Sequence, residues 1–174
     1  MRLANPVDYL TVRPIGDLSA KFPESVITHV LDLITDREAD VIGRAVLERH
    51  GIDVVLRLFG NFPSEEREEL FWIVKDGGWY IAAGVLGYWP YDPVYGEIWT
   101  GNQPYVDSPD AAVIKAYQGR GIYKSVLYAL RDMLKLPMES SQAMTAGSIR
   151  VWKHLPGVEV IERRGEPLYR WPLP

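Results

Sequence analysis

Two apolar runs rich in aromatic residues, separated by a short glycine turn, constrain the fold of this chain most strongly. Residues 71–74 are Phe-Trp-Ile-Val, residues 79–89 begin and end with tryptophan, and Asp76-Gly77-Gly78 lies between the two runs. An Asp-Gly pair between hydrophobic runs is a strong hairpin signal, because glycine adopts the positive φ of the turn without a steric cost. The sequence therefore predicts two adjacent antiparallel strands and a β-sheet built around them.

Helical and extended patterns alternate on both sides of this hairpin. Before it, we expect a strand at residues 9–14, a helix starting at Pro23, a second helix at residues 41–46 behind a capping box at residues 35–38, and another helix start at residues 63–66. After it, we expect strands at residues 95–100, 111–117 and 138–144, a helix after Gly121 that Pro137 ends, a helix capped by Thr145, and strands at residues 158–161 and 168–171. Residues 52–59 fit both a strand and a buried helix, and residues 102–104 and 107–110 have the composition of loops. This order predicts a single α/β (α+β mixed) domain over residues 1–174, with a sheet between helices on both faces.

Composition and charge argue against several classes of protein. The 19 Lys plus Arg against 23 Asp plus Glu give a net charge of −4, and there is no basic run, so we expect no nucleic-acid partner. The chain has no cysteine, and its three histidines lie far apart without metal-ligand spacing, so we expect no disulfide and no metal site. No apolar run approaches the roughly 20 residues that span a bilayer, and the N-terminus lacks an apolar signal core. We therefore expect a cytoplasmic protein without a membrane partner.

A strand, a glycine turn and a helix start follow one another in residues 113–123. At such a junction several backbone N–H groups point at one spot, and the positive end of the helix dipole lies behind them. Gly119 and Gly121 allow a phosphate to approach the backbone, and Arg120 and Lys124 add positive charge at the rim. The turn has no Gly-Lys-Ser/Thr of a Walker loop and is not a full Gly-x-Gly-x-x-Gly fingerprint. Spacing alone leaves two interpretations open, a phosphate site and a tight connection without a ligand.

The hexapeptide Tyr-Gln-Gly-Arg-Gly-Ile at residues 117–122 resembles motif A of the GNAT superfamily of N-acetyltransferases, whose pattern is Gln/Arg-x-x-Gly-x-Gly/Ala. Gln118 and Gly121 match the first two fixed positions, and Tyr123 stands where the family has Gly or Ala. The predicted element order also resembles the GNAT fold over nearly the full chain, which implies a central mixed, mostly antiparallel, splayed β-sheet flanked by helices on both faces. The resemblance implies an N-acyltransferase whose cosubstrate is an acyl-CoA, with acetyl-CoA expected.

The resemblance also implies where coenzyme A binds. The pyrophosphate is expected on the turn and helix start, at Gln118, Gly119, Arg120, Gly121, Ile122, Tyr123 and Lys124. The pantetheine amides are expected to pair with the strand edge at Val113, Ile114 and Lys115 like an added strand, although Lys115 stands where the family often has proline. Residues 145–155 fall where the family has its last helix beside the thioester, and Thr145 replaces the asparagine common there.

The catalytic residues match the family less closely. The family often carries a tyrosine on its last helix as the general acid for the departing thiolate, and Trp152 occupies that position here. Indole is not a usable acid near neutral pH, so the acid is another residue, water or absent. Glu97 is the candidate base, because it lies in a predicted strand beside aromatic residues that raise a carboxyl pKa by desolvation. Asp107, Asp110 and His154 compete for this role, and for each candidate a purely structural or solvent-facing role is the alternative.

Three functional hypotheses follow from these observations. In the first, an acceptor amine, either a small molecule or a protein amine, attacks the thioester directly in a ternary complex, since no cysteine is present to carry the acyl group. In the second, the chain is a GNAT-like binding protein that has lost catalysis, which Tyr123 and Trp152 favour. In the third, it is a nucleotide-binding domain unrelated to acyl transfer. The sequence neither requires nor excludes a homodimer.

Overall fold

The computed structural model of the protein describes residues 23–60, 68–90, 104–142, 144–163 and 165–174. The predicted strands at residues 9–14 and 95–100 and the predicted helix start at residues 63–66 lie outside these ranges, and so does Glu97.

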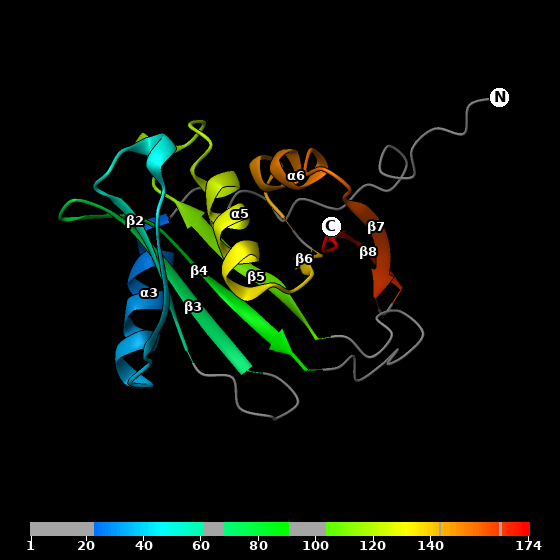
Figure 1. The fold of residues 1–174 in the computed structure, drawn as a ribbon, viewed down its shortest axis with the longest axis horizontal. Coiled ribbons are helices and arrows are strands. Elements are labelled where there is room, and N and C mark those ends of the chain that lie inside the picture. Colours follow the sequence, from blue (N-terminus) through cyan, green and yellow to red (C-terminus); the bar gives the residue numbers. More distant parts are fainter. Residues whose placement is uncertain (1–22, 61–67, 91–103, 143, 164) are drawn as a thin grey trace.

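One mixed sheet of eight strands organises the described chain, in the order β1-β2-β3-β4-β5-β6-β8-β7 (Figure 1). The strands are β1 (Val41–Val46), β2 (Val54–Phe59), β3 (Glu68–Asp76), β4 (Trp79–Trp89), β5 (Tyr105–Val113), β6 (Met138–Ser140), β7 (Glu159–Arg163) and β8 (Glu166–Trp171). Every neighbouring pair is antiparallel except β5 and β6, which run parallel. The predicted class is confirmed in this form, as an α/β chain with an open and mostly antiparallel sheet.

The hairpin predicted at residues 76–78 is confirmed. Strands β3 and β4 pair from Asp76↔Trp79 to Glu68↔Tyr88, and Gly77 has a φ of 56°. The middle of each strand is buried at consecutive positions rather than alternate ones. This pattern arises because helices cover both faces of the sheet at this point, so neither face of the hairpin is left to water.

The second predicted helix is wrong, since residues 41–46 form strand β1. Helix α3 (Pro23–Asp36) starts at the predicted proline, but the predicted capping box after it does not form. Instead the Thr35 hydroxyl donates to the carbonyl of Leu31 inside α3, and Glu38 takes a left-handed φ of 49°. The β-branched residues of this segment then pair with β2, which resolves residues 54–59 as a strand.

The loop predicted at residues 107–110 is also wrong, because these residues lie within β5. The register changes there: Val85 pairs with Asp110, whereas Gly87 pairs with Asp107. Strand β5 therefore carries one residue more than β4 over this interval, which is a β-bulge. Proline lacks a ladder donor and is tolerated in a sheet at such a bulge, and Pro109 lies there with its side chain exposed.

The two remaining helices agree with the local signals. Helix α5 (Ile122–Leu134) begins directly after Gly121 and ends at Lys135, whose φ is 54°. Helix α6 (Ala146–Lys153) is capped as predicted, because the Thr145 hydroxyl accepts from the backbone N–H of Ser148 at 3.1 Å. The strand predicted at residues 138–144 is confirmed only over Met138–Ser140.

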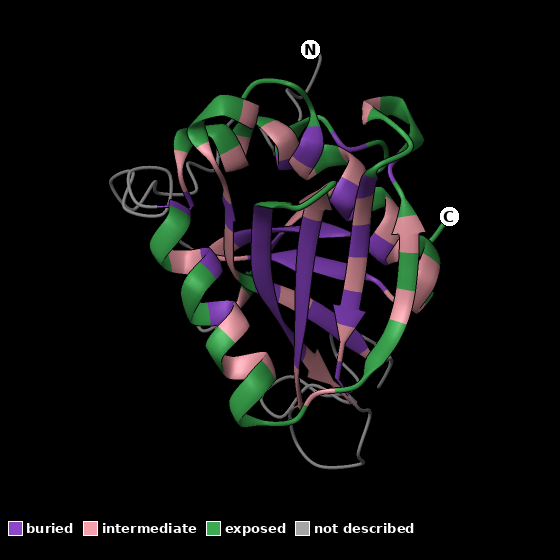
Figure 2. Ribbon diagram, turned by 90° about the vertical axis from the view of Figure 1, so that its left-hand side faces the viewer, coloured by how far each residue is buried: buried purple, intermediate pink, exposed green. Residues whose placement is uncertain are grey.

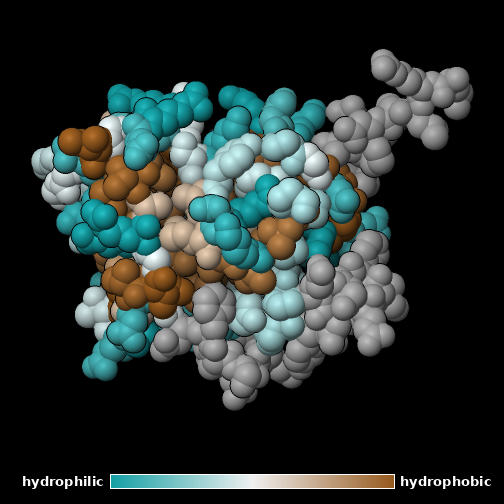
Figure 3. All heavy atoms as spheres, viewed as in Figure 1, coloured by the Kyte–Doolittle hydropathy of each residue, from teal (hydrophilic) through white to brown (hydrophobic). Residues whose placement is uncertain are grey.

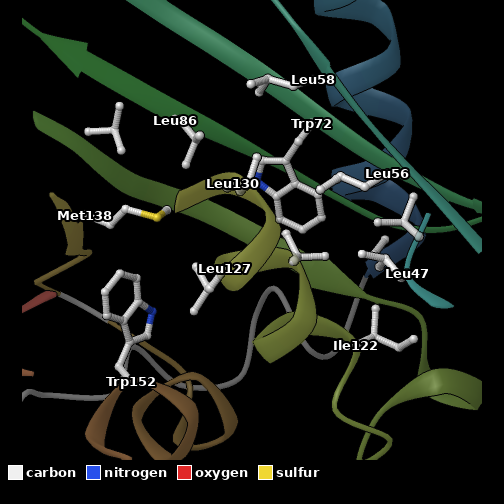
Figure 4. Close-up of a cluster of buried hydrophobic side chains, with 14 of the residues drawn as sticks. Leu47, Leu56, Leu58, Trp72, Leu86, Ile122, Leu127, Leu130, Met138 and Trp152 are labelled. Atoms are coloured by element: carbon white, nitrogen blue, oxygen red, sulfur yellow. The ribbon is translucent and has the colours of Figure 1, made fainter. Parts of the chain in front are cut away.

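The core has two parts, one on each face of the sheet. Ile27 and Val30 of α3 pack against β3 and β4 on one face, and α5 packs on the opposite face. Buried residues concentrate in the central strands, as Figure 2 shows. On the α5 side, Trp72 lies near Leu127 and Leu130 and is fully buried (Figure 4).

The surface is mixed in polarity. Hydrophilic residues cover much of the face shown in Figure 3, with apolar residues exposed on its left-hand part. Within the described ranges, no helix has both the length and the apolar character needed to cross a membrane.

Candidate functional site

The end of β5 and the start of α5 are joined by a short 3-10 turn at Lys115–Tyr117 and a glycine turn. Gly119 and Gly121 have φ values of 76° and 80°. This left-handed region disfavours residues with a Cβ, so the two glycines are what allow the chain to turn here. An added Cβ at Gly119 would have no heavy atom within 4 Å, and one at Gly121 would have only His50 Cε1, at 3.9 Å. The backbone is therefore open to a ligand at both glycines.

Several backbone N–H groups at this junction are free. The first helical hydrogen bond of α5 runs from Ser125 N to Gly121 O. Within the described part of the chain, the N–H groups of residues 119–124 have no hydrogen-bond acceptor. Unpaired N–H groups at a helix N-terminus attract an anion, because they can donate to it and the helix dipole adds positive potential.

Side-chain contacts also brace the turn. The Gln118 side-chain amide donates to Val113 O at 2.8 Å, which ties the turn back to the end of β5. The Tyr117 hydroxyl donates to Asp76 Oδ2 at 2.6 Å, and this hydrogen bond raises the Tyr117 pKa. The Arg120 guanidinium lies 4.9 Å from the centre of the Tyr117 ring. The turn is thus anchored to the β3–β4 hairpin before any ligand binds.

A cavity of about 570 Å³ begins at this turn and extends between β5 and α6. It is lined by residues 111–113 of β5, by residues of the turn and first turn of α5, and by Thr145 and residues of α6 as far as Val151. Two helix N-termini therefore border the same space, and both contribute positive potential. Most of the predicted coenzyme-binding residues lie in this lining, namely Val113, Gln118, Gly119, Gly121, Ile122, Tyr123, Lys124 and Thr145. Ile114, Lys115 and Arg120 were predicted to join them but do not line it.

Charge in the cavity is opposite in sign to that of the whole chain. Lys124 and Arg150 are among its described lining residues, and none of those residues is an aspartate or glutamate. The protein as a whole carries a net charge of −4. A cationic cavity in an acidic protein favours an anionic ligand at that place, because the positive lining attracts the anion and the acidic remainder of the surface repels it.

Tyr123 points from the turn toward the inner end of the cavity. Its ring stacks on Trp72 with 6.4 Å between ring centres and 20° between planes. Its hydroxyl lies 3.1 Å from Trp152 Nε1 and 3.3 Å from Ser108 Oγ. The side chain is therefore turned away from the free amides of the turn, so the residue that replaces the small one of the family pattern does not cover them.

A smaller chamber of about 40 Å³ adjoins Tyr123, on the side of the β5 bulge. Its lining is largely polar and includes Ser108, Asp110, Thr145 and Ser148. Burial raises the pKa of Asp110, although the Ala111 backbone N–H and the charge of His29 oppose this shift. The Asp110 side chain itself lies on the other face of the sheet, because Asp110 pairs with Val85, which packs in the core beneath α3.

Strands β5 and β6 separate just beyond this chamber. They pair only at Val106↔Met138, Asp107↔Glu139 and Ser108↔Ser140, whereas β5 continues to Val113. Within the described chain, residues 109–113 of β5 therefore have no strand partner on the β6 side. An unpaired strand edge offers main-chain donors and acceptors to an extended ligand.

The other predicted catalytic residues have structural contacts. Trp152 is fully buried, and its indole N–H is used by Tyr123. His154 Nδ1 lies 2.7 Å from Arg150 O, within its own helix. The Asp107 carboxylate accepts from Gly87 N at 3.0 Å and from Trp89 Nε1 at 3.3 Å, which ties it to β4.

Three residues of the site were not singled out from the sequence. Ser108 was assigned to a loop, although a proline inside an extended run is a known signal of a bulge. Arg150 lies in the predicted last helix, but the sequence does not show which face of that helix borders a cavity. His50 is brought to α5 by the fold, where its Nε2 lies 2.8 Å from Ser125 Oγ.

The chain was also compared with known proteins. No family model, no curated protein and no solved structure matches it.

Proposed function

We propose that the protein is an acyl-CoA-dependent N-acyltransferase of the GNAT kind, with acetyl-CoA as cosubstrate. The cavity that starts at the free amides of residues 119–124 carries this proposal, because it holds two cations and no described carboxylate. A pyrophosphate needs donors and positive charge together, and the junction offers both. The volume of about 570 Å³ lies in the range typical of small-molecule sites.

The path from the turn into the protein supports a coenzyme with a long amide-bearing arm. The open edge of β5 at residues 109–113 leads from the glycine turn to the polar chamber beside Ser108. Five residues of strand span about 16 Å, which is comparable with an extended pantetheine arm. A diphosphate on the turn would therefore place its thioester near the chamber, where Asp110 and Tyr123 lie.

Acyl transfer to an amine requires a group that takes a proton from the attacking nitrogen. Glu97, the predicted base, lies outside the described residues, and the Asp110 side chain lies on the α3 face of the sheet with its cross-strand partner Val85. The proposal therefore assigns this role to no described carboxylate. Because the protein has no cysteine, the amine attacks the thioester directly and no thiol-bound intermediate forms. An amine, free or on a protein, is the acceptor class.

Titration calorimetry with CoA, acetyl-CoA and ATP tests the binding step. We expect CoA and acetyl-CoA to bind and ATP to fail to displace them. Lys124→Gln should weaken CoA binding about 5- to 10-fold by removing one phosphate-facing charge. Lys135→Gln is the matched control, because Lys135 lies at the other end of α5 beside Asp132. Equal effects of the two substitutions, or no binding of CoA, would reject the proposal.

A thiol-release assay with a panel of amines tests the chemistry. Turnover that depends on an added amine supports the transferase. Binding of CoA without turnover with any amine would favour the second candidate, a GNAT-like binding protein. This second candidate is favoured by the hydrogen bond between the Trp152 indole and Tyr123, because it uses the indole N–H within the protein.

A further inference from the structure

We infer that His50 is a further binding residue for the coenzyme, and that its imidazole donates a hydrogen bond to a phosphate on the outer side of the glycine turn. This inference rests on the proposed function. The residue comes from the connection between β1 and β2, which is remote from the turn in sequence.

His50 lies beside the start of α5. Its Cε1 is 3.9 Å from the position that a Cβ on Gly121 would occupy. Its Nε2 lies 2.8 Å from the hydroxyl oxygen of Ser125, in the first turn of α5. The connection that carries His50, cyan in Figure 1, therefore reaches the same place as the glycine turn (Figure 1). The imidazole is thus a neighbour of the free amides of residues 119–124.

The edge of the ring that faces the turn carries both nitrogens. In imidazole, Cε1 is bonded to Nδ1 and to Nε2, so an approach through Cε1 brings both nitrogens toward the start of α5. Ser125 occupies Nε2, and within the described chain Nδ1 has no hydrogen-bond partner. When the Ser125 hydroxyl donates to Nε2, the ring proton is on Nδ1, which can then donate to a ligand. A protonated ring donates from both nitrogens and adds a positive charge.

The backbone holds His50 in place before a ligand arrives. Its N–H donates to the carbonyl of Leu47 at 2.8 Å, and Leu47 is only 6% exposed and belongs to the core. The carbonyl of Asp53 accepts from the N–H of Gly77 at 3.1 Å, which ties the other end of the connection to the β3–β4 hairpin. A donor on a braced segment loses little conformational freedom on binding, so more of its hydrogen-bond energy contributes to affinity.

The cavity indicates which part of the coenzyme reaches His50. The pantetheine arm is proposed to enter the cavity along β5, and His50 is not among the residues that line this cavity. The arm and the nucleotide are attached to opposite ends of the diphosphate, so the nucleotide extends away from the cavity. His50 is therefore placed for the diphosphate or for the 3′-phosphate of the nucleotide, and both are acceptors that suit an imidazole donor.

Calorimetry with CoA and 3′-dephospho-CoA tests the inference without an acceptor amine. His50→Gln should weaken CoA binding about 3- to 10-fold, the range of one hydrogen bond. An equal loss with 3′-dephospho-CoA assigns His50 to the diphosphate, whereas a loss confined to CoA assigns it to the 3′-phosphate. His50→Lys should bind CoA within about 2-fold of wild-type protein, because lysine keeps a donor and a positive charge.

His29→Gln is the matched control, because His29 is exposed on α3, which packs on the opposite face of the sheet from α5. It should bind CoA like wild-type protein. Unaltered CoA affinity in His50→Gln would overturn the inference and leave the proposed function standing. Equal losses in His50→Gln and His50→Lys would also overturn it, since the residue would then only maintain the fold of its connection. Failure of wild-type protein to bind CoA at all would instead overturn the proposed function.

Discussion

A carboxylate introduced at Gly121 distinguishes the two interpretations of the glycine turn, namely a phosphate site and a tight connection without a ligand. With a φ of 80°, it precedes the first residue of α5, and an added Cβ would meet only His50 Cε1 at 3.9 Å. The space around Gly121 therefore admits an aspartate side chain, although the left-handed φ strains its backbone, and the carboxylate lies beside the free amides. A carboxylate at a helix N-terminus is favourable for the fold, so the helix should survive the change.

The expected loss of CoA affinity follows from the charges. Two unit charges about 5 Å apart repel by about 0.8 kcal/mol in water and about 3 kcal/mol at an effective dielectric of 20. A diphosphate carries two such charges, so the repulsion amounts to about 2–6 kcal/mol, which is a loss of at least about 30-fold in affinity. The carboxylate also occupies the amides that the pyrophosphate needs. We expect calorimetry to show CoA binding by Gly121→Asp at least about 30-fold weaker than by wild-type protein.

Two control variants separate charge from backbone strain. Gly121→Asn has nearly the same shape and tolerates a left-handed backbone, so it should lose much less affinity. Gly165→Asp introduces the same residue at a φ of 78° in the β7–β8 turn, far along the chain, and should bind CoA like wild-type protein. The difference between Asp and Asn at residue 121 should shrink at high salt. Equal CoA affinities of Gly121→Asp and Gly121→Asn would refute the electrostatic reasoning.

Three further predictions concern stability. The contribution of Asp110 to stability should be present below its ordinary pKa of 3.8 and be lost as the pH rises through its raised pKa. In urea unfolding, the stability of Asp110→Asn relative to wild-type protein should therefore rise from about pH 3 to about pH 7. The reverse trend would contradict the burial of this carboxyl. Glu139→Gln should cost about 3–5 kcal/mol in urea unfolding at pH 9, because Glu139 is 1% exposed and its carboxylate pairs with Arg163 and Arg170. This pH is chosen because burial raises the pKa of Glu139 to about 8, and a change below 1 kcal/mol would count against the prediction. Gly84→Ala should cost about 1–3 kcal/mol, since its Cβ would lie 2.4 Å from the Trp72 ring, whereas Gly78→Ala, with no atom within 4 Å, should change stability by less than about 0.5 kcal/mol in the same assay.

Local signals were reliable where a short segment determines its own conformation. The Asp76-Gly77-Gly78 hairpin, the helix after Gly121 and the Thr145 cap each depend on backbone angles or hydrogen bonds within a few residues. Such features can be predicted because neighbours in sequence are sufficient to stabilise them. The strand, glycine turn and helix that follow one another up to Ile122 belong to this class.

Tertiary contacts decided the rest. The apolar spacing of residues 41–46 fits a helix, but pairing with β2 makes this segment a strand. The bulge at residues 107–110 exists only because β4 lies beside β5 with a different residue count. The partners of Tyr123, namely Trp72, Ser108 and Trp152, come from three other elements. The sequence by itself determined that a strand, a glycine turn and a helix follow one another, because that order depends on local backbone preferences. Only the folded sheet decided that this junction opens into a cationic cavity ending at a tyrosine hydroxyl, because strand pairing and helix packing bring distant residues together.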